Sequence, residues 1–435
     1  MQLTKLRGFR DLLGADARLL GIIEARARSI AERHNVAEIR VPALERHNLY
    51  ARSTGETSDI VEKQLYVVQR SSESSGGVDQ VLRPEGTPGV VRAYIEAGLD
   101  RTDPEQRYFY SGPMFRYERP QKGRYREFYQ FGVEFFGRSD AAADAELMVM
   151  IDELRRELRL ELNFEINSLG DARCRPFFRQ ALLEWGRAHL PQLCQDCHQR
   201  LERNPLRLLD CKIDVKLTES APKSVDYLCD ECRAHFDTVR ELLANGGVPH
   251  TINPRLVRGL DYYSRTAFEV ISTGVGAQSA VAAGGRYDGL VEALGGAPVA
   301  GTGFAIGVDR LALALDAAEF EVRPDAALIA LGDSAARAAI QLSAEMRGRG
   351  LRVEVLSSER GLRAQLRRAD KLKARYALII GENEMAGGVV QLRDLAQSTQ
   401  QEVPRAEVVE RLAADAVSSP RFPGEGVPSE LRTTR

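Results

Sequence analysis

Residues 107–136, RYFYSGPMFRYERPQKGRYREFYQFGVEFF, contain two alternating aromatic segments with a basic loop between them. Alternation with a period of two predicts strands, so Arg107–Tyr110 and Phe128–Phe136 are expected to be strands of one antiparallel sheet. The loop 116–126 carries five Lys or Arg residues and one Glu, a local charge of +4. Because arginine binds phosphate oxygens in pairs, this loop favours a polyphosphate or a nucleic-acid end. The plainer alternative is a solvated hairpin tip.

The sequence around this hairpin alternates between helical and strand patterns. We expect helices over 12–35 and 142–160, and strands over 38–41, 64–69, 78–83, 162–167, 267–272 and 277–283. The segment 301–315 opens with glycines and is expected to run into a helix. After Pro324 a strand–helix–strand rhythm predicts a small parallel α/β domain.

Residues 171–250 differ in composition from the rest, since they hold all six cysteines and four of the six histidines. We interpret them as an inserted unit that divides one domain into two parts. The expected domains are 1–170 with 251–323, the insert 171–250, a third domain over 324–415, and a disordered tail over 416–435.

Overall composition argues against a general attraction to nucleic acid or membranes. The 435 residues carry 60 Lys and Arg against 62 Asp and Glu, a net charge of −2. Any polyanion must therefore be held by local patches. No apolar run approaches the length of about 20 residues that spans a bilayer, and the first residues lack the apolar core of a secretory signal. We expect a cytoplasmic protein without a membrane partner.

Several short segments add chemistry to the basic loop. Arg83-Pro-Glu-Gly-Thr87 offers a carboxylate and a hydroxyl that can hold an amine, and Arg258-Gly-Leu-Asp-Tyr-Tyr263 combines an arginine with two tyrosines. The glycines of Ala283-Gly-Gly-Arg-Tyr-Asp-Gly289 would let a flat ring approach the backbone, and Gly301–Arg310 supplies one more arginine. Each segment alone is weak evidence for a binding site. A glycine pair in a strand, for example, more often marks a β-bulge than a ligand site.

These segments contain no histidine, serine or cysteine positioned as a nucleophile, so triad hydrolysis is disfavoured. The pattern of a P-loop ATPase is also missing. A site of arginines, carboxylates and tyrosines suits a nucleophile that is already charged, such as a substrate carboxylate attacking a nucleotide α-phosphate. That reaction needs charge neutralisation at phosphorus and fixed orientation of the reactants.

The same segments resemble the class II aminoacyl-tRNA synthetases, and within them the histidyl-tRNA synthetase family, from about Arg7 to about Leu412. The helix and strand that end at Pro42 resemble the family's first motif, which forms the homodimer interface; the second motif is matched from Phe115 to Glu134 and the third over Gly301–Leu315. Segments 258–263 and 284–289 look specific to the histidine enzymes. The resemblance implies an α+β catalytic domain on an antiparallel sheet, a small inserted domain and a C-terminal α/β anticodon-binding domain.

The resemblance also implies roles for individual residues. Arg116 would bind the α-phosphate of ATP, and Arg310 would bind its γ-phosphate. Arg124 would also bind ATP. Arg258 would approach the α-phosphate as a catalytic residue. Glu85, Thr87 and Gln130 would hold the α-ammonium group of histidine, Glu134 and Tyr263 would bind the two imidazole nitrogens, and Tyr262 would line the pocket. Neutral imidazole offers one donor and one acceptor, so it needs unlike partners at its two ends.

The implied reaction has two steps: Mg²⁺-ATP activates L-histidine to histidyl-adenylate, and the histidyl group is then transferred to the 3′ end of tRNA-His. The resemblance also implies that the enzyme is a homodimer. The window 345–375 of the last domain holds ten Lys and Arg against four Asp and Glu, a local +6 that could meet tRNA phosphates. A solvated charged helix face explains that window equally well.

Two alternatives come from other functional classes. One is a synthetase-like regulatory subunit that activates the first enzyme of histidine biosynthesis; such proteins typically lack the anticodon domain and lose the arginines. The other is a noncatalytic tRNA-binding protein, which would not need a histidine pocket.

Cys194-Gln-Asp-Cys197 and Cys229-Asp-Glu-Cys232 form two Cys-x-x-Cys pairs with 31 residues between them. Four thiolates so paired predict a single structural zinc site, with Cys211 and His198 as alternative ligands. The plainer alternative is a set of free thiols.

Overall fold

The structure is a computed structural model that describes residues 3–55, 58, 60–68, 79–257, 262–274 and 280–418, with the backbone alone at 319 and 416–418. The chain divides into two compact units, Met1–Ala317 and Ala318–Arg435. The finer division into an insert and two catalytic parts stays a prediction. Most of the expected tail lies outside the described residues, although a helix continues through residue 418.

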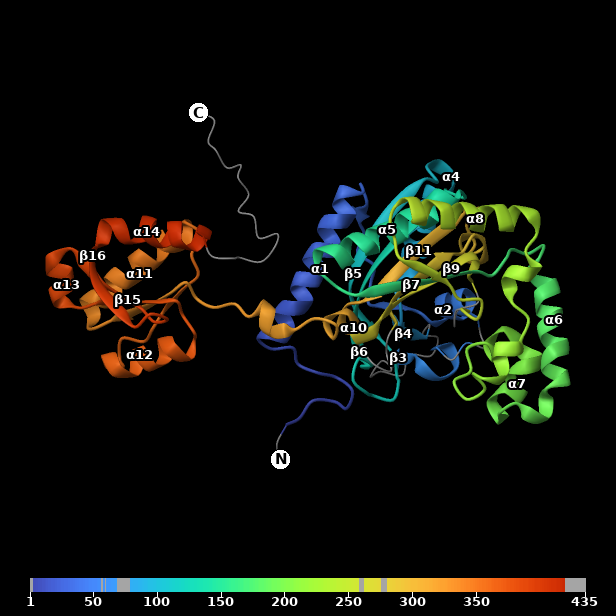
Figure 1. Cartoon of the computed structure of the whole chain (residues 1–435), viewed down its shortest axis with the longest axis horizontal. Helices are drawn as coiled ribbons and strands as arrows, with labels where there is room; N and C mark the ends of the chain where they lie inside the picture. Colours follow the sequence, from blue (N-terminus) through green and yellow to red (C-terminus); the bar gives the residue numbers. More distant parts are fainter. Residues whose placement is uncertain are drawn as a thin grey trace. The chain divides into compact units, whose positions relative to one another are not determined.

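An eight-stranded sheet forms the centre of the first unit (Figure 1). Its strands are mutually antiparallel except at the two edges, where β1 pairs with β5 and β7 with β8 in parallel. In spatial order the strands are β1 (Ala37–Glu38), β5 (Gln106–Phe115), β6 (Glu127–Phe136), β11 (Gly301–Gly307), β10 (Ala280–Arg286), β9 (Ser264–Ser272), β7 (Leu162–Ser168) and β8 (His250–Ile252). The predicted α+β fold on an antiparallel sheet is confirmed, and so is the pairing of the aromatic strands.

Helices cover one face of this sheet. Helix α1 (Ala15–Arg33) contacts β5 and β6, α5 (Ala141–Glu157) contacts β11, and α8 (Asp230–Asn245) contacts β9. Their apolar residues recur at helical spacing, as in Leu19, Leu20, Ile23 and Ala27 of α1, which places one apolar stripe against the strands. Figure 1 shows α1, α5 and α8 together on this side of the sheet.

Side chains alternate along β5 and β6, and this alternation decides which residues face the side of the sheet opposite to α1. Phe109 and Phe131 stack on each other, and Phe109 lies under Arg28 of α1. Tyr110 and Phe136 pack instead with Val90 and Tyr94 of α3 (Thr87–Glu96). Gln130 and Glu134 share the parity of Phe136, so they belong to this second face.

Smaller elements complete the first unit. A three-stranded sheet and α2 (His47–Thr54) lie next to α3. The strands are β2 (Leu44–Arg46), β4 (Gln80–Leu82) and β3 (Tyr66–Val68). Between β7 and β8 the chain forms α6 (Arg175–Ala188), α7 (Gln195–Arg203), four short 3-10 turns and α8. Further short helices are α4 (Leu99–Thr102), α9 (Leu290–Ala293) and α10 (Val308–Ala312).

The glycine-rich segment from Gly301 differs from its prediction. Residues Gly301–Gly307 form the central strand β11, and the helix that follows, α10, has only five residues. Glycine suits this strand because its neighbours approach closely. A Cβ at Gly303 would overlap the carboxyl of Glu134, and one at Gly301 would overlap the ring of Tyr287.

The second unit contains a five-stranded sheet in the order β13-β12-β14-β15-β16. Strands β12 (Ala326–Ala330), β13 (Val353–Val355) and β14 (Tyr376–Ile380) are parallel, whereas β15 (Val389–Asp394) and β16 (Thr399–Pro404) are antiparallel. The predicted parallel α/β arrangement is confirmed for β12, β13 and β14, but the prediction did not include the antiparallel strands β15 and β16. Polar residues on the solvated side of β15 and β16 hide the apolar signal on which that prediction depended.

Helices cover both faces of this second sheet. Alternate residues of β12 pack against α11 (Asp333–Gly348) and α14 (Arg405–Ser418) on one face, and against α12 (Leu362–Lys371) on the other. Helix α13 (Glu382–Gly387) connects β14 to β15. All five residues of β12 are buried, as expected for a parallel strand covered on both sides. Among the described residues, no helix is long and apolar enough to cross a membrane.

A buried ionic network ties the sheet to its helices. Arg286, fully buried at the end of β10, donates to both carboxylate oxygens of Asp144 on α5, at 2.6 and 3.2 Å. It also donates to the backbone carbonyls of Arg138 and Asp140. His235 of α8 bonds Asp144 from the other side at 2.8 Å. This arginine therefore stabilises the fold and does not face the substrate cleft.

We expect Asp144→Asn to lower the free energy of unfolding by about 3–5 kcal/mol, because it leaves a buried guanidinium without its charged partner. The measurement is denaturant unfolding of both proteins at one pH. The matched control, Glu202→Gln, breaks the exposed pair between Arg187 and Glu202 and should leave stability unchanged. A loss below about 1 kcal/mol for Asp144→Asn would contradict the role given to this network.

Candidate active site

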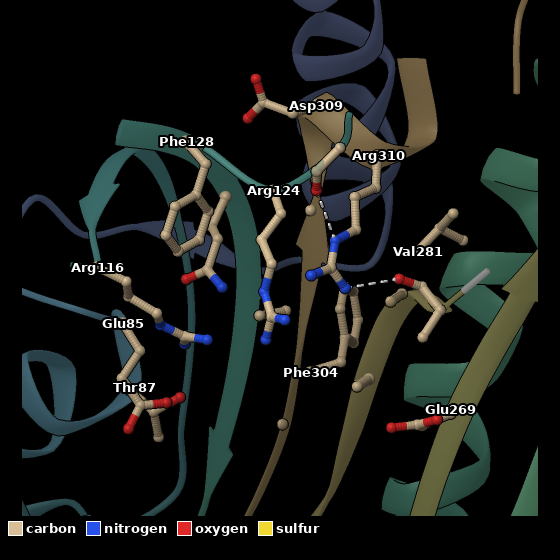
Figure 2. Close-up of a pocket in the computed structure, with 18 of the residues that line it drawn as sticks. Glu85, Thr87, Arg116, Arg124, Phe128, Glu269, Val281, Phe304, Asp309 and Arg310 are labelled. Atoms are coloured by element: carbon tan, nitrogen blue, oxygen red, sulfur yellow. Dashed lines mark hydrogen bonds between the residues drawn. The ribbon is translucent and has the colours of Figure 1, made fainter. Parts of the chain in front are cut away.

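A cavity of about 170 Å³ opens on the α3 face of the large sheet. Its walls come from the loop before α3, the β5–β6 hairpin, strands β9, β10 and β11, and the start of α10 (Figure 2). The lining is mixed, with apolar rings beside charged and hydroxyl groups, as in sites that orient a small ligand. The lining residues that sequence analysis selected are Glu85, Thr87, Arg116, Arg124, Gln130, Tyr262, Tyr263 and Arg310.

Three arginines from three separate elements meet in this cavity. Figure 2 shows the guanidinium groups of Arg116, Arg124 and Arg310 directed toward a common space. Burial, together with the positive charges of Arg116 and Arg124, lowers the pKa of Arg310 below its usual value. Such a concentration of positive charge suits a polyanionic ligand.

Each arginine is held by fixed partners. Arg116 donates to the backbone carbonyl of Pro84 at 2.9 Å, and its guanidinium lies 5.3 Å from the centre of the Phe128 ring. Arg310 donates to the carbonyls of Gly123 and Ala280, both at 3.1 Å. Arg124 pairs with Glu118 within the hairpin loop. These contacts orient the guanidiniums before any ligand arrives, which reduces the entropy lost on binding.

Acceptors for an ammonium group line the part of the cavity beside α3. Glu85 and Thr87 flank the first turn of α3, and both are buried. Gln130 of β6 lines the same wall, and its buried side-chain carbonyl oxygen has no hydrogen-bond partner in the described part of the chain. Three oxygen-bearing side chains thus line the cavity, and Figure 2 shows two of them, Glu85 and Thr87, beside Arg116.

Glu134 lies just beneath this part of the cavity. It is fully buried and accepts hydrogen bonds from Thr87 Oγ1, at 2.6 Å, and from the hydroxyl of Tyr287. Burial raises the pKa of the Glu134 carboxyl to about 8, although the two hydrogen bonds oppose that rise. A carboxyl in this state can donate a proton to a ligand at neutral pH and accept one at higher pH.

Tyr262 and Tyr263 precede β9 and form an aromatic wall beside Glu134. Their rings lie 4.7 Å apart, and Tyr262 also meets the ring of Tyr287 edge-on at 5.8 Å. The Tyr262 hydroxyl donates to Glu85 at 3.1 Å, so the aromatic wall and the acidic group are joined. Burial raises the pKa of Tyr262 well above its usual value, and the hydroxyl therefore stays protonated as a donor.

Most of the residues proposed from the sequence therefore lie in or beside one cavity. Arg258, the proposed catalytic arginine, lies outside the described residues. Sequence analysis missed Phe128, Tyr287, Glu118 and Glu269, which also line the cavity. A parity argument on β6 would have found Phe128, which shares the face of Gln130; no local signal identifies Glu269.

The structure does not bring the four cysteines of the predicted single zinc site together. Cys194 and Cys197 group with Cys211 and Asp214, whereas Cys229 and Cys232 group with Asp171 and Cys174. The two Cys-x-x-Cys pairs begin different helices, α7 and α8, and each finds its partners in a different segment of the insert. His198, one proposed alternative ligand, instead bonds the carbonyl of Leu190 at 2.7 Å.

The antiparallel sheet and the cleft with its hairpin arginine define a class II aminoacyl-tRNA synthetase fold. A family model described as histidyl-tRNA synthetase matches residues 8–169 and 185–311, and one described as anticodon binding domain matches residues 325–415. The chain belongs to the histidyl-tRNA synthetase family.

Curated relatives and solved structures agree with this assignment. A histidine–tRNA ligase of Trichlorobacter lovleyi is 47% identical over 406 residues, which are 93% of this chain and 96% of the relative. One of Geobacter metallireducens is 46% identical over 404 residues, 92% of this chain and 97% of the relative. The crystal structure of apo histidyl-tRNA synthetase from S. aureus matches with a TM-score of 0.76 at 32% identity, covering 95% of this chain and all of that one.

We expect Glu134 to be protonated in the ligand-free protein at pH 6.5 and to lose its proton as the pH rises through about 8. Because its pKa in the folded state exceeds the ordinary value of 4.5, the free energy of unfolding falls as the pH rises from about 4.5 to about 8 and levels off above that. Infrared spectroscopy would show a protonated-carboxyl band that fades toward pH 9 and is missing in Glu134→Gln. A band that is absent at pH 6.5, or that persists in the variant, would contradict this protonation state.

Proposed function

We propose that the chain is a histidine–tRNA ligase whose cleft joins L-histidine to AMP before transfer to tRNA-His. The observation that supports this most directly is that Arg116, Arg124 and Arg310 line the same cavity as Glu85, Thr87 and Gln130. Phosphate-binding groups and ammonium-binding groups in one cavity fit an amino acid and a nucleotide placed head to head.

In the first step the carboxylate of histidine attacks the α-phosphorus of ATP, the new C–O–P link forms, and pyrophosphate leaves with the electrons of the broken P–O bond. The nucleophile is already an anion, so no general base is required. The arginines supply what the reaction needs, which is neutralisation of charge that increases at phosphorus. Arg116 is assigned to the α-phosphate, Arg310 to the γ-phosphate, and Arg258 to the α-phosphate as the catalytic arginine.

The hairpin and β11 also provide a place for the adenine ring. Phe128 and Phe304 both line the cavity, and Figure 2 shows Arg124 between Phe128 and Arg310. We assign Phe128 and Arg310 to the two faces of the ring, since a planar cation and an aromatic ring both stack on a base. Arg124 then covers the phosphates from the loop.

Imidazole recognition is assigned to Glu134 and Tyr263, with Tyr262 as the wall. Glu134 already accepts from Thr87 and Tyr287, and a carboxyl group with two oxygens has capacity for one more partner. An analogue without ring nitrogens would leave buried polar groups unpaired, which costs about 1–3 kcal/mol for each group. This cost excludes amino acids of similar size.

Mg²⁺ enters with ATP, and the donor set of the cleft fits it. Glu118 and Glu269 are carboxylates that line the cavity, and oxygen ligands of this kind are those that Mg²⁺ prefers. These two residues would hold the ion. Bound there, Mg²⁺ neutralises phosphate charge alongside the arginines.

Binding of tRNA is assigned to the second unit. Arg363, Arg367 and Lys371 are exposed on α12 and spaced by four residues, so they form one cationic row on the helix. Some other cations of the window 345–375 are paired with acids, for example Arg349 with Glu410 and Lys373 with Glu321. The row on α12 is therefore a part of the window that is available to phosphates.

Assembly as a homodimer and location in the cytoplasm belong to the same proposal. The dimer is inferred from the first motif, whose helix is α1 and whose strand is the sheet edge β1. Sedimentation velocity of the purified chain should show a species of twice the monomer mass, and a monomer at micromolar concentration would refute the dimer. The cytoplasm is where ATP, histidine and tRNA-His are together.

A regulatory subunit without ligase activity is the main alternative. A structure titled ATP phosphoribosyltransferase regulatory subunit/histidyl-tRNA synthetase, from Bacillus halodurans C, matches with a TM-score of 0.65 at 21% identity, which supports the shared fold alone. The intact arginines of the cleft and the anticodon-binding unit favour the ligase.

We expect ATP–pyrophosphate exchange with L-histidine and with none of the other amino acids. We also expect Arg258→Ala to slow exchange at least about 100-fold while histidine affinity changes less than threefold, because this arginine acts on charge at phosphorus. Equilibrium dialysis measures the affinity. Folded wild-type protein without exchange would refute the ligase, and an Arg258→Ala variant with normal turnover but weak histidine binding would refute the role of Arg258.

We expect the triple variant Arg363→Ala/Arg367→Ala/Lys371→Ala to bind tRNA-His more weakly. The slope of log affinity against log salt concentration should fall by about 2–3, since up to three phosphate contacts are lost. Filter binding at several salt concentrations measures this slope. ATP–pyrophosphate exchange is the internal control and should be unchanged, and an unchanged salt slope would exclude the α12 row from the interface.

A further inference from the structure

The six cysteines of the insert gather in two separate clusters, and each cluster includes one aspartate. We name the first site A, formed by Asp171, Cys174, Cys229 and Cys232, and the second site B, formed by Cys194, Cys197, Cys211 and Asp214. Within each site the four ligand atoms lie within 4.8 Å of one another. Every cysteine of the chain therefore belongs to one of the two clusters.

The two clusters have the same composition and the same local spacing. Each is built from two pairs with two residues between the partners. Site A uses Asp171-Ala-Arg-Cys174 and Cys229-Asp-Glu-Cys232; site B uses Cys194-Gln-Asp-Cys197 and Cys211-Lys-Ile-Asp214. The aspartate begins the first pair of site A but ends the second pair of site B. The two sites therefore place the aspartate differently along the chain but offer the same donors, three thiols and one carboxylate.

The distances within the clusters match the edges of a zinc tetrahedron. With Zn–S near 2.3 Å and Zn–O near 2.0 Å, tetrahedral ligands lie about 3.8 Å apart for S···S and about 3.5 Å for S···O. In site B, Cys194 Sγ lies 3.7 Å from Cys211 Sγ, and Cys211 Sγ lies 3.6 Å from Asp214 Oδ2. In site A, Cys174 Sγ lies 3.6 Å from Asp171 Oδ1.

The backbone that carries these groups is well suited to a metal site. Cys194 and Cys229 are the N-cap residues of α7 and α8, and neither side chain caps its helix. Cys197 and Cys232 follow in the first turn and are fully buried. The helix start thus directs two sulfurs of each site inward, and positive helix ends favour thiolates.

We propose that site A and site B each bind one structural Zn²⁺ through three cysteine thiolates and one aspartate. Binding releases three thiol protons per site, and each complex then carries a charge of −2. Four protein ligands close the tetrahedron, so neither ion has a position for a reacting water.

Groups around the ligands stabilise these charges. Arg173 donates to Asp171 Oδ2 at 2.8 Å, and Arg265 lies 3.5 Å from the same oxygen. Oδ1 of Asp171 is the oxygen nearer to Cys174, so one oxygen serves the metal while the other is held by arginine. In site B the backbone N–H of Cys194 donates to Asp214 Oδ2 at 3.0 Å.

Disulfides explain these clusters less well. A disulfide requires sulfurs about 2.05 Å apart, and with three cysteines per cluster any bond within one would leave a thiol over. Cys211 and Cys197 contribute to a small apolar core, and a unit of this size gains from a metal crosslink.

Each ion would anchor a different part of the insert. Site A joins the segment that enters the insert, at Asp171 and Cys174, to the start of α8, which returns the chain to the sheet. The residue after Cys174, Arg175, donates to the backbone carbonyl of Tyr263 at 2.9 Å. Site A therefore fixes a helix start that touches the aromatic wall of the cleft. Site B closes the loop between α7 and the following turns.

Zinc stoichiometry tests the proposal on the full-length enzyme, expressed with zinc in the medium and purified without chelators. Plasma mass spectrometry should find two Zn²⁺ per chain. Cys194→Ser and Cys229→Ser should each retain one, and the double variant should retain none. A single site shared by both Cys-x-x-Cys pairs would instead give one ion in the wild type and none in either single variant, and that result would overturn the proposal.

Aspartate variants keep the test valid if a cysteine variant fails to fold. Asp171→Asn and Asp214→Asn should each lower zinc affinity at one site at least about tenfold in competition with a chromophoric chelator. The matched controls are Asp230→Asn and Asp196→Asn, exposed acids in the same helix turns, together with His198→Asn; all three should keep two tightly bound ions. Folded wild-type protein with six freely titratable thiols and no zinc would refute both sites.

Discussion

The cleft depends on three guanidinium groups held close together in a partly buried space. Arg116 comes from the end of β5, Arg124 from the hairpin loop and Arg310 from the start of α10. Burial and mutual repulsion, which together lower the pKa of Arg310, make the ligand-free arrangement electrostatically unfavourable. Backbone carbonyls and Glu118 offset part of that cost. A triphosphate removes the rest, so the binding of ATP is favoured by the energy stored in the ligand-free fold.

The sheet makes this arrangement possible because its side chains alternate between two faces, one for packing and one for the cleft. One set of side chains on β5 and β6 packs under α1 and stabilises the domain, whereas the other set, including Gln130 and Glu134, faces the cleft. Glycines at 301 and 303 let Tyr287 and Glu134 lie against β11 without a Cβ between them. Arg286 fastens the same strands to α5 and α8. Rigidity on one face thus supports precise chemistry on the other.

Local patterns predicted what depends on local physics. The aromatic alternation of 107–110 and 128–136 identified β5 and β6, and the strand–helix rhythm after Pro324 identified the parallel part of the second sheet. Sequence patterns failed where contacts between residues far apart in the chain decide the structure. Gly301–Gly307 is a strand because β6 and β10 enclose it, and no periodicity of its own indicates this. The cysteine spacing suggested a metal, but only the fold shows that Asp171 and Asp214 separate six thiols into two clusters.

The central claim is that one cavity holds a nucleotide phosphate at its arginines and an imidazole ring between Glu134 and Tyr263. A crystal structure with a non-hydrolysable histidyl-adenylate analogue measures this directly. The account predicts guanidinium nitrogens of Arg116 within hydrogen-bond distance of the group that replaces the α-phosphate. It also predicts Glu134 and the Tyr263 hydroxyl at the two different ring nitrogens. An analogue bound with its ring outside that pair, or with its phosphate mimic away from Arg116, would contradict the account.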